Sequence, residues 1–177
     1  MGDAAKHIFL TIIFKTCVFF VQGQPNIQGN PILWNYNPVE YNAGMQNWKI
    51  IQDKRGIMYF ANNNGLLEYD GTSWRLHPVK NNTLLRSVTI SRQGRIYVAG
   101  PGEIGYFMAD LSGRLVYHSI INFLPEQEQE FDEVWSVYWL NNKVYFCSFE
   151  EVFIFHEETQ TLQLFDPRII GWPILFC

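Results

Sequence analysis

The chain is poor in charged residues. Asp, Glu, Lys and Arg together make up only 17% of its 177 residues, and the net charge at neutral pH is −4. No run of Lys or Arg occurs, so the sequence lacks the basic stripe that a nucleic-acid-binding surface needs. We therefore predict no nucleic-acid partner.

The sequence also lacks the residue spacings that common chemistry requires. Its four histidines are dispersed and fit no metal-ligand spacing. Segment 100–105 is rich in glycine but contains a proline and precedes no helix, which indicates a turn between strands rather than a nucleotide loop. No nucleophile elbow and no convergent pair of carboxylates stands out. We predict no catalytic residue, no metal site and no cofactor, and we interpret the protein as a non-enzyme.

Cysteine is scarce, with three residues in the whole chain. Cys17 lies in the N-terminal segment and Cys177 is the last residue, and nothing in the spacing demands a disulfide. Cys147 occupies an apolar position within a strand-like run. We expect it to be a buried thiol.

The N-terminus resembles a secretory signal peptide. A weakly basic start precedes an apolar stretch over 8–21, which is interrupted by Lys15. This stretch is shorter than the ~20 apolar residues that cross a bilayer. We expect a signal peptide over 1–23 that directs export to the periplasm, followed by a lead-in segment over 24–47. An uncleaved anchor is the alternative.

Aromatic residues, by contrast, are abundant, at 16% of the chain, and they follow a repeated pattern. Four short apolar runs, each ended by a turn signal, fill residues 48–78 and predict one four-stranded antiparallel unit. The pattern recurs over 86–118, where Gly94 follows Gly56 by 38 residues. That offset is near the ~40–45 residues of known four-strand repeats. A looser third copy covers 134–166.

These repeats predict an all-β fold, a partial β-propeller of about three four-stranded antiparallel blades within residues 48–177. The first two hairpins place glycine where a tight turn needs positive φ, and Asn141 and Asn142 are expected to do so in the third. Propellers typically close with about 4–8 blades. Three blades would leave an apolar face uncovered at each end, so we expect a truncated propeller.

Aromatic side chains are the candidate ligand contacts, because a ring buries area against a sugar while its polar tip forms hydrogen bonds. The tryptophans are Trp34, Trp48, Trp74, Trp135, Trp139 and Trp172. Trp48 and Trp135 occupy equivalent repeat positions, which favours a core role over ligand contact. Phe107, Phe123 and Phe149 interrupt the pattern as loop aromatics and are equally good candidates. The sequence assigns none of them as a ligand-binding residue.

The segment from Asp70 to Trp74 is comparable to the Asp-box turn of sialidase-type propellers. We interpret Asp70 as an acceptor of backbone N–H bonds across the turn rather than as a catalytic acid. Trp74 is expected to pack against a neighbouring sheet. The acidic segment 126–133 is interpreted as a solvated loop.

The first repeat closely resembles the two-component regulator propeller repeat, over residues 52–62 and 65–74, and the second copy fits over 94–106. Proteins of this family are exported, membrane-anchored sensors of Gram-negative bacteria. The resemblance implies periplasmic propellers, a triple-tyrosine domain, a transmembrane helix and an output domain that is a histidine kinase or a helix-turn-helix. No sequence of those later parts is present, so membrane attachment is expected only through downstream segments that are missing.

From this resemblance we expect a ligand-sensing periplasmic propeller of a bacterial signal-transduction receptor. Many such receptors sense oligosaccharides, which implies an oligosaccharide ligand and a homodimer formed through the full-length receptor. Two alternatives remain open. One is a secreted carbohydrate-active enzyme on a propeller scaffold, and the other is a protein-binding propeller.

Overall fold

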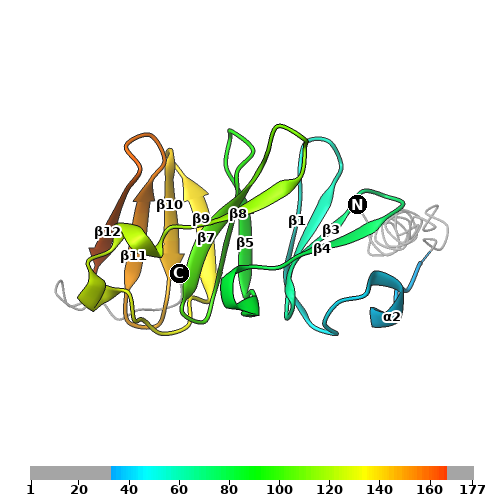
Figure 1. Ribbon diagram of the computed structural model, residues 1–177, viewed down its shortest axis with the longest axis horizontal. Coiled ribbons are helices and arrows are strands. Elements are labelled where there is room, and N and C mark those ends of the chain that lie inside the picture. Colours follow the sequence, from blue (N-terminus) through cyan, green and yellow to red (C-terminus); the bar gives the residue numbers. More distant parts are fainter. Residues whose placement is uncertain (1–32, 167–177) are drawn as a thin grey trace, which may run out of the picture. The chain divides into compact units, whose positions relative to one another are not determined.

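The computed structural model describes residues 33–166, and the expected signal peptide, Cys17, Trp172 and Cys177 lie outside them. The described part is all-β, with three four-stranded antiparallel sheets, which confirms the predicted fold class (Figure 1). The sheets are here called blades 1, 2 and 3 in chain order. The described helical elements are one turn of α-helix and three 3-10 turns: α2 (Pro38–Tyr41), η1 (Lys80–Asn82), η2 (Ile121–Phe123) and η3 (Glu126–Glu128).

Each blade is a meander in which every strand pairs with the next one along the chain. Blade 1 consists of β1 (Asn47–Gln52), β2 (Met58–Asn62), β3 (Gly65–Tyr69) and β4 (Trp74–His77). Blade 2 consists of β5 (Ser87–Ile90), β6 (Ile96–Gly100), β7 (Glu103–Ala109) and β8 (Leu115–Ser119). Blade 3 consists of β9 (Ser136–Leu140), β10 (Lys143–Cys147), β11 (Val152–His156) and β12 (Thr161–Phe165).

The first strands of the blades lie next to one another. Strand β5 contacts β1 on one side and β9 on the other. Successive blades thus present their first strands to a shared line, as propeller blades do around a central axis. We call β1, β5 and β9 the inner strands.

Local sequence explains the hairpins that follow the inner strands. In blade 1 the Asp53 carboxylate accepts hydrogen bonds from the backbone N–H groups of Arg55 and Ile57, at 2.8 and 3.0 Å, and Gly56 supplies a φ of 89°. In blade 3 Asn141 and Asn142 adopt φ values of 51° and 60°. Asn tolerates this left-handed region better than most residues, which confirms the turn predicted there.

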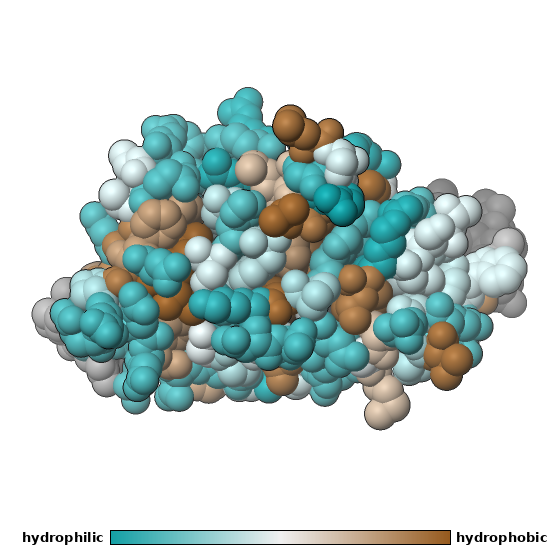
Figure 2. All heavy atoms as spheres, viewed as in Figure 1, coloured by the Kyte–Doolittle hydropathy of each residue, from teal (hydrophilic) through white to brown (hydrophobic). Residues whose placement is uncertain are grey.

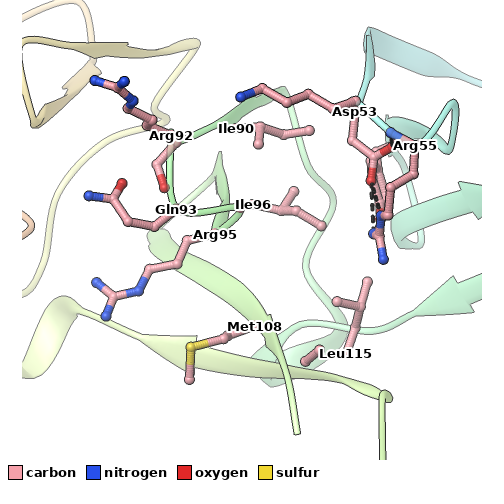
Figure 3. Close-up of a pocket in the computed structure, with 14 residues that line it drawn as sticks. Asp53, Arg55, Ile90, Arg92, Gln93, Arg95, Ile96, Met108 and Leu115 are labelled. Carbon is pink, nitrogen blue, oxygen red and sulfur yellow. Dashed lines mark hydrogen bonds and ion pairs between the residues drawn. The ribbon is translucent and has the colours of Figure 1, made fainter.

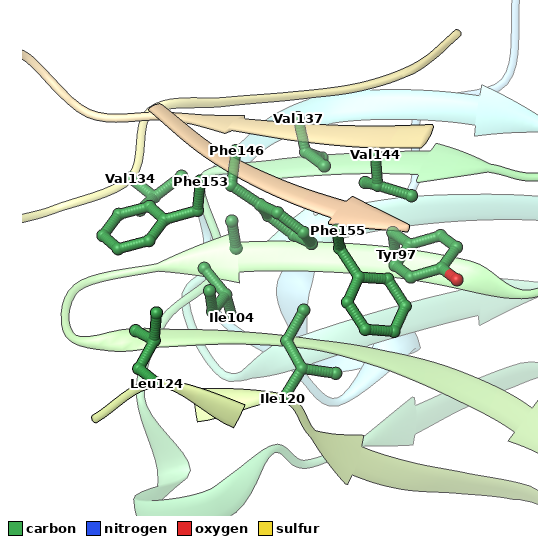
Figure 4. Close-up of a cluster of buried hydrophobic side chains, with 11 residues drawn as sticks. Tyr97, Ile104, Ile120, Leu124, Val134, Val137, Val144, Phe146, Phe153 and Phe155 are labelled. Atoms are coloured by element: carbon green, nitrogen blue, oxygen red, sulfur yellow. The ribbon is translucent and has the colours of Figure 1, made fainter. Parts of the chain in front are cut away.

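Two hydrophobic cores form between successive blades. The seam between blades 1 and 2, called seam 1–2, buries Tyr59, Ala61, Leu66, Val79, Leu85, Val88, Ile96, Val98 and Phe107. The seam between blades 2 and 3, called seam 2–3, buries Tyr97, Ala99, Ile104, Ile120, Leu124, Val134, Val137, Val144, Phe146, Phe153 and Phe155 (Figure 4). The middle strands of blades 1 and 2 contribute to cores on both faces, which is why these strands are apolar on both sides. Cys147 is buried, as expected. On the face shown in Figure 2, hydrophilic residues predominate and apolar residues form separate small patches.

The face of blade 1 that points away from blade 2 corrects two expectations. Trp74 does not pack against a neighbouring sheet; it stacks on Tyr69 of its own blade at 4.3 Å between ring centroids and also contacts Tyr36 and Tyr41. Asn37 caps α2 through a capping box with Glu40, and Tyr41 of α2 packs with the blade 1 core residues Phe60 and Leu67. The lead-in segment therefore covers part of a face that the sequence led us to expect bare.

Candidate functional site

One candidate surface lies at the start of the inner strands. The three blades carry Trp48, Arg86 and Trp135 at equivalent positions. Each of these residues lies two positions before a matched inner-strand residue, namely Ile50, Val88 or Val137. The Arg86 guanidinium lies between the two indoles, 3.7 Å from the Trp48 ring centroid and 4.6 Å from that of Trp135. A cation in that position is attracted to both ring faces.

Glu133 completes this inner-strand cluster by accepting a hydrogen bond and ion pair from Arg86 Nε. The acidic segment 126–133 is thus not simply a solvated loop. It contains the 3-10 turn η3, and its last residue is attached to blade 2 because Arg86 needs a counter-charge where it is largely removed from water.

The tryptophans of the cluster remain partly accessible, which corrects the prediction that they belong to the core. Trp48 and Trp135 are 38% and 36% exposed. Phe149, which is 55% exposed, packs on Trp135 at 5.5 Å between ring centroids. These residues form an aromatic surface beside a cation, which has the chemistry to pack against a sugar ring.

Lys49 joins the three inner strands just inside this cluster. Its Nζ donates to Ser87 Oγ at 3.2 Å and to the Val137 carbonyl at 3.1 Å. It also lies 4.8 Å from the Tyr138 ring centroid. Burial lowers the pKa of the Lys49 ammonium, partly offset by the nearby Cys147. With its donors directed at both neighbouring blades, Lys49 holds the blades together.

A second candidate surface is a cavity of about 500 Å³ in seam 1–2, called the basic cavity. It lies between the β1–β2 and β5–β6 hairpins, and Figure 3 shows Arg92 and Arg95 on one side with Asp53 and Arg55 on the other. Its walls include the apolar residues Ile90, Ile96, Met108, Ala109 and Leu115. Four of the chain's 13 Lys and Arg residues line it, but only one carboxylate does. The cavity is therefore basic in a protein that is acidic overall.

The single carboxylate of the basic cavity is already engaged. Asp53 binds the Arg55 side chain at 2.8 Å as well as two backbone N–H groups. Burial opposes ionisation of Asp53, but the hydrogen bonds from Arg55 and Ile57 outweigh it and lower the Asp53 pKa. Lys54 and Arg92, in contrast, form no ion pair with any residue of 33–166. Their charges are available to a ligand.

The other sequence candidates lie apart from these surfaces. Asp70 Oδ1 accepts the backbone N–H groups of Thr72 and Ser73 at 3.0 and 2.7 Å, as predicted for a turn. Phe107 is not a loop aromatic; it is 1% exposed in β7, where it pairs with Ile96 and faces blade 1. The remaining described candidates are Trp34, which is exposed, Phe123, which is half-exposed, and Trp139, which packs on the seam 2–3 core.

Sequence reasoning missed the basic cavity, although a signal was present. Lys54 and Arg92 occupy the same position in two equivalent hairpin turns, and each has another cation nearby in sequence. The sequence prediction used these turns only for their backbone conformation and did not consider the positive charges of their side chains.

Within residues 33–166 no helix is long and apolar enough to cross a membrane, and no group of His, Cys, Asp and Glu residues is placed to hold a metal ion.

No family model and no curated protein matches this chain. Among solved structures, it is similar to the extracellular domain of BT4673 from B. thetaiotaomicron, described as a hybrid two-component system (22% identity, TM-score 0.56, covering 72% of this chain and 16% of that chain). It is also similar to the corresponding domain of BT3049 from the same organism (14% identity, TM-score 0.53, covering 82% and 20%). The chain shares the fold of these extracellular domains. It spans less than a quarter of their length.

Two lyases share the fold at a similar level. Virginiamycin B lyase from Staphylococcus aureus matches with 12% identity and a TM-score of 0.51, covering 68% of this chain and 41% of that chain. A streptogramin B lyase matches with 13% identity and a TM-score of 0.50, covering 66% and 39%. The fold by itself therefore does not separate a sensor from an enzyme.

Proposed function

We propose that the chain is the ligand-sensing portion of an exported receptor, which binds a saccharide outside the cytoplasm without transforming it. The similarity to the extracellular domains of BT4673 and BT3049 carries this proposal. The inner-strand cluster supports it with the exposed aromatic rings Trp48, Trp135 and Phe149 beside Arg86. Such a surface suits ligands that pack against rings and accept hydrogen bonds.

Sensing would operate by population shift. A ligand that binds one arrangement of receptor subunits more tightly than another moves the equilibrium toward the first. In this chain the ligand would contact loops held by rigid blades, and the output would lie in other domains of a homodimeric receptor.

The second candidate function is a lyase, because two lyases share the fold. An enzyme needs an acid or base positioned at the reacting atom. Asp53 of the basic cavity and Glu133 of the inner-strand cluster are each paired with an arginine. This pairing favours the sensor over the lyase.

Calorimetric titration of the purified chain with neutral and acidic oligosaccharides tests the proposal, with chromatography of the recovered sugars. Saturable binding with every sugar recovered unchanged supports a sensor. Cleavage products would overturn it in favour of an enzyme, and absence of binding across the library would also overturn it. Osmotic-shock fractionation of the expressing bacterium tests export. An exported chain should be recovered in the periplasmic fraction.

A further inference from the structure

We propose that the basic cavity of seam 1–2 binds a small organic polyanion, with sulfated or uronate-containing oligosaccharides as the class that fits a sensor. This inference names a ligand class and so rests on the proposed function. It depends on a different surface from the inner-strand cluster, which allows the two to be tested separately.

The cavity exists because one side chain present in seam 2–3 is missing from seam 1–2. Strand pairing places Phe107 opposite Ile96 in blade 2 and Phe155 opposite Val144 in blade 3, and both phenylalanines face the preceding blade. Two residues further on, blade 3 has Glu157 and blade 2 has Ala109.

Glu157 closes its seam from within. It is 5% exposed and accepts hydrogen bonds from Tyr97 Oη at 3.1 Å and Trp139 Nε1 at 3.2 Å, with Arg95 Nη1 at 3.9 Å. Ala109 carries neither the length nor the charge to do this. The end of seam 1–2 stays open, with cations around it and no protein carboxylate in the place of Glu157.

The charges around the opening favour an anion. Lys54, Arg55, Arg92 and Arg95 line the cavity from two hairpins on neighbouring blades. In Figure 3 the Arg92 and Arg95 side chains extend from the rim, away from Asp53 and Arg55. Asp53 offsets Arg55, and Glu157 lies close to Arg95. Lys54 and Arg92 are left without a counter-charge among residues 33–166. Two uncompensated cations at the rim match a ligand that carries more than one anionic group.

A buried hydroxyl points to the same conclusion. Ser91 lines the cavity, is 4% exposed, and its Oγ has no hydrogen-bond partner in the described part of the chain. The matched residue in blade 1 is Asp53, whose carboxylate accepts backbone N–H groups. A buried polar group without a partner is unfavourable, and an anionic oxygen could accept a hydrogen bond from the Ser91 hydroxyl. The apolar walls exclude a fully hydrated ion and favour an organic ligand with apolar surface.

The experiment titrates the full chain with a sulfated disaccharide, the same disaccharide without sulfate, and inorganic sulfate. We expect the sulfated sugar to bind at least about tenfold more tightly than either other probe, a difference of ~1.4 kcal/mol. Binding should weaken as ionic strength rises from about 0.05 to about 0.3 M, because the charges of the rim are screened. Equal affinity for the sulfated and unsulfated sugars would overturn the proposal.

The double variant Lys54→Ala, Arg92→Ala should weaken binding of the sulfated sugar about tenfold or more. Its matched control is Lys80→Ala, Arg114→Ala, which removes the same charge from exposed residues outside the cavity and should bind like the parent. An unchanged affinity in the first variant would locate binding elsewhere and overturn the inference.

Ser91→Ala separates a ligand contact from a structural role. Removing a hydroxyl that has no partner should leave the unfolding temperature of the free chain unchanged or slightly raised, yet weaken binding of the sulfated sugar. Lower stability with unchanged binding would overturn a ligand contact at Ser91. If neutral oligosaccharides bind through the inner-strand cluster while the cavity variants have no effect, the polyanion inference fails and the sensor proposal stands. If the cavity binds the polyanion but the sugars are cleaved, the sensor proposal fails and the anion site stands.

Discussion

The two seams of this molecule are built from the same repeat but filled differently. Seam 2–3 is filled by Phe146, Phe153 and Phe155, all fully buried. Seam 1–2 has Val98 where blade 3 has Phe146, and Gly105 where it has Phe153.

Gly105 is not a gap in seam 1–2. A Cβ added there would collide with the Tyr117 hydroxyl, so the tyrosine occupies the space that Phe153 fills in the next blade. Tyr117 Oη donates to Glu103 Oε1 at 2.7 Å, which keeps its polar end satisfied. Seam 2–3 is thus packed with rings from the middle strands β10 and β11, whereas seam 1–2 is filled at this point by Tyr117 from the outer strand β8.

The seams also differ at the hairpin end, where Glu157 closes one and Ala109 leaves the other open. The blade repeat requires only that the middle of each seam be apolar. The repeat does not fix the side chain at the hairpin end of a seam. Glu157 fills that position in seam 2–3, whereas Ala109 in seam 1–2 lines a cavity. Seam 2–3 is therefore closed by its own side chains, whereas the open end of seam 1–2 is the proposed polyanion site.

The largest expected change in stability follows from a substitution in seam 2–3. Phe153→Ala removes a fully buried ring that packs on Phe131 at 4.7 Å between centroids, and should lower the free energy of unfolding by about 3–5 kcal/mol. Denaturant unfolding followed by tryptophan fluorescence measures it. Leu111→Ala, at a fully exposed position, is the control and should change stability by less than about 0.5 kcal/mol. A loss below about 1 kcal/mol for Phe153→Ala would mean that seam 2–3 is not the tightly packed joint described.

An intermediate effect is expected at the hairpin ends. Glu157→Ala leaves the buried Tyr97 hydroxyl and Trp139 N–H without their partner and should cost about 1–3 kcal/mol. The reciprocal variant Ala109→Glu should change stability little, because its side chain enters an existing cavity among cations. It should also weaken binding of the sulfated disaccharide. Equal stability losses in the two variants would contradict the distinction between a closed and an open seam.

Much of the fold could be predicted from sequence because its determinants are local. Gly56, Gly94 and the pair Asn141-Asn142 mark the hairpins through backbone conformations that few other residues adopt. Asp70 likewise marks its turn by bonds to residues two and three positions ahead. Such signals do not depend on how one blade meets the next.

The candidate sites depend on contacts between blades, which local patterns do not reveal. Arg86 could be aligned with Trp48 and Trp135 in sequence, but its place between the two rings follows from adjacency of the inner strands. The significance of Ala109 appears only when the strand registers of blades 2 and 3 show that it occupies the position equivalent to Glu157. Phe107 was misassigned for the same reason, because β7 continues past the aromatic spacing used to locate it.

The smallest expected effect compares matched tyrosines of the two seams at high pH. Burial, together with the carboxylates of Glu68 and Asp53, raises the pKa of Tyr59 to about 12, despite opposition from Arg55. Burial also raises the pKa of Tyr97, with Glu157 adding to the shift. A raised folded-state pKa contributes stability below pH ~10 that is lost as pH rises toward the folded value, because the unfolded chain releases the proton first.

Stability should therefore fall between pH 10 and about 12, with each such tyrosine contributing at most about 1.4 kcal/mol per pH unit. Tyr59→Phe should make this decline shallower and leave neutral-pH stability nearly unchanged, since the Tyr59 hydroxyl interacts with the exposed Arg55. Tyr97→Phe should flatten the decline too, but it should also lower stability at neutral pH, because it leaves the buried Glu157 with one donor fewer. Unfolding temperatures measured across this pH range distinguish the two. If both variants lowered the unfolding temperature at neutral pH by the same amount, the Tyr59 hydroxyl in seam 1–2 would contribute as much stability as the Tyr97 hydroxyl in seam 2–3, which would contradict the distinction between the open and the closed seam.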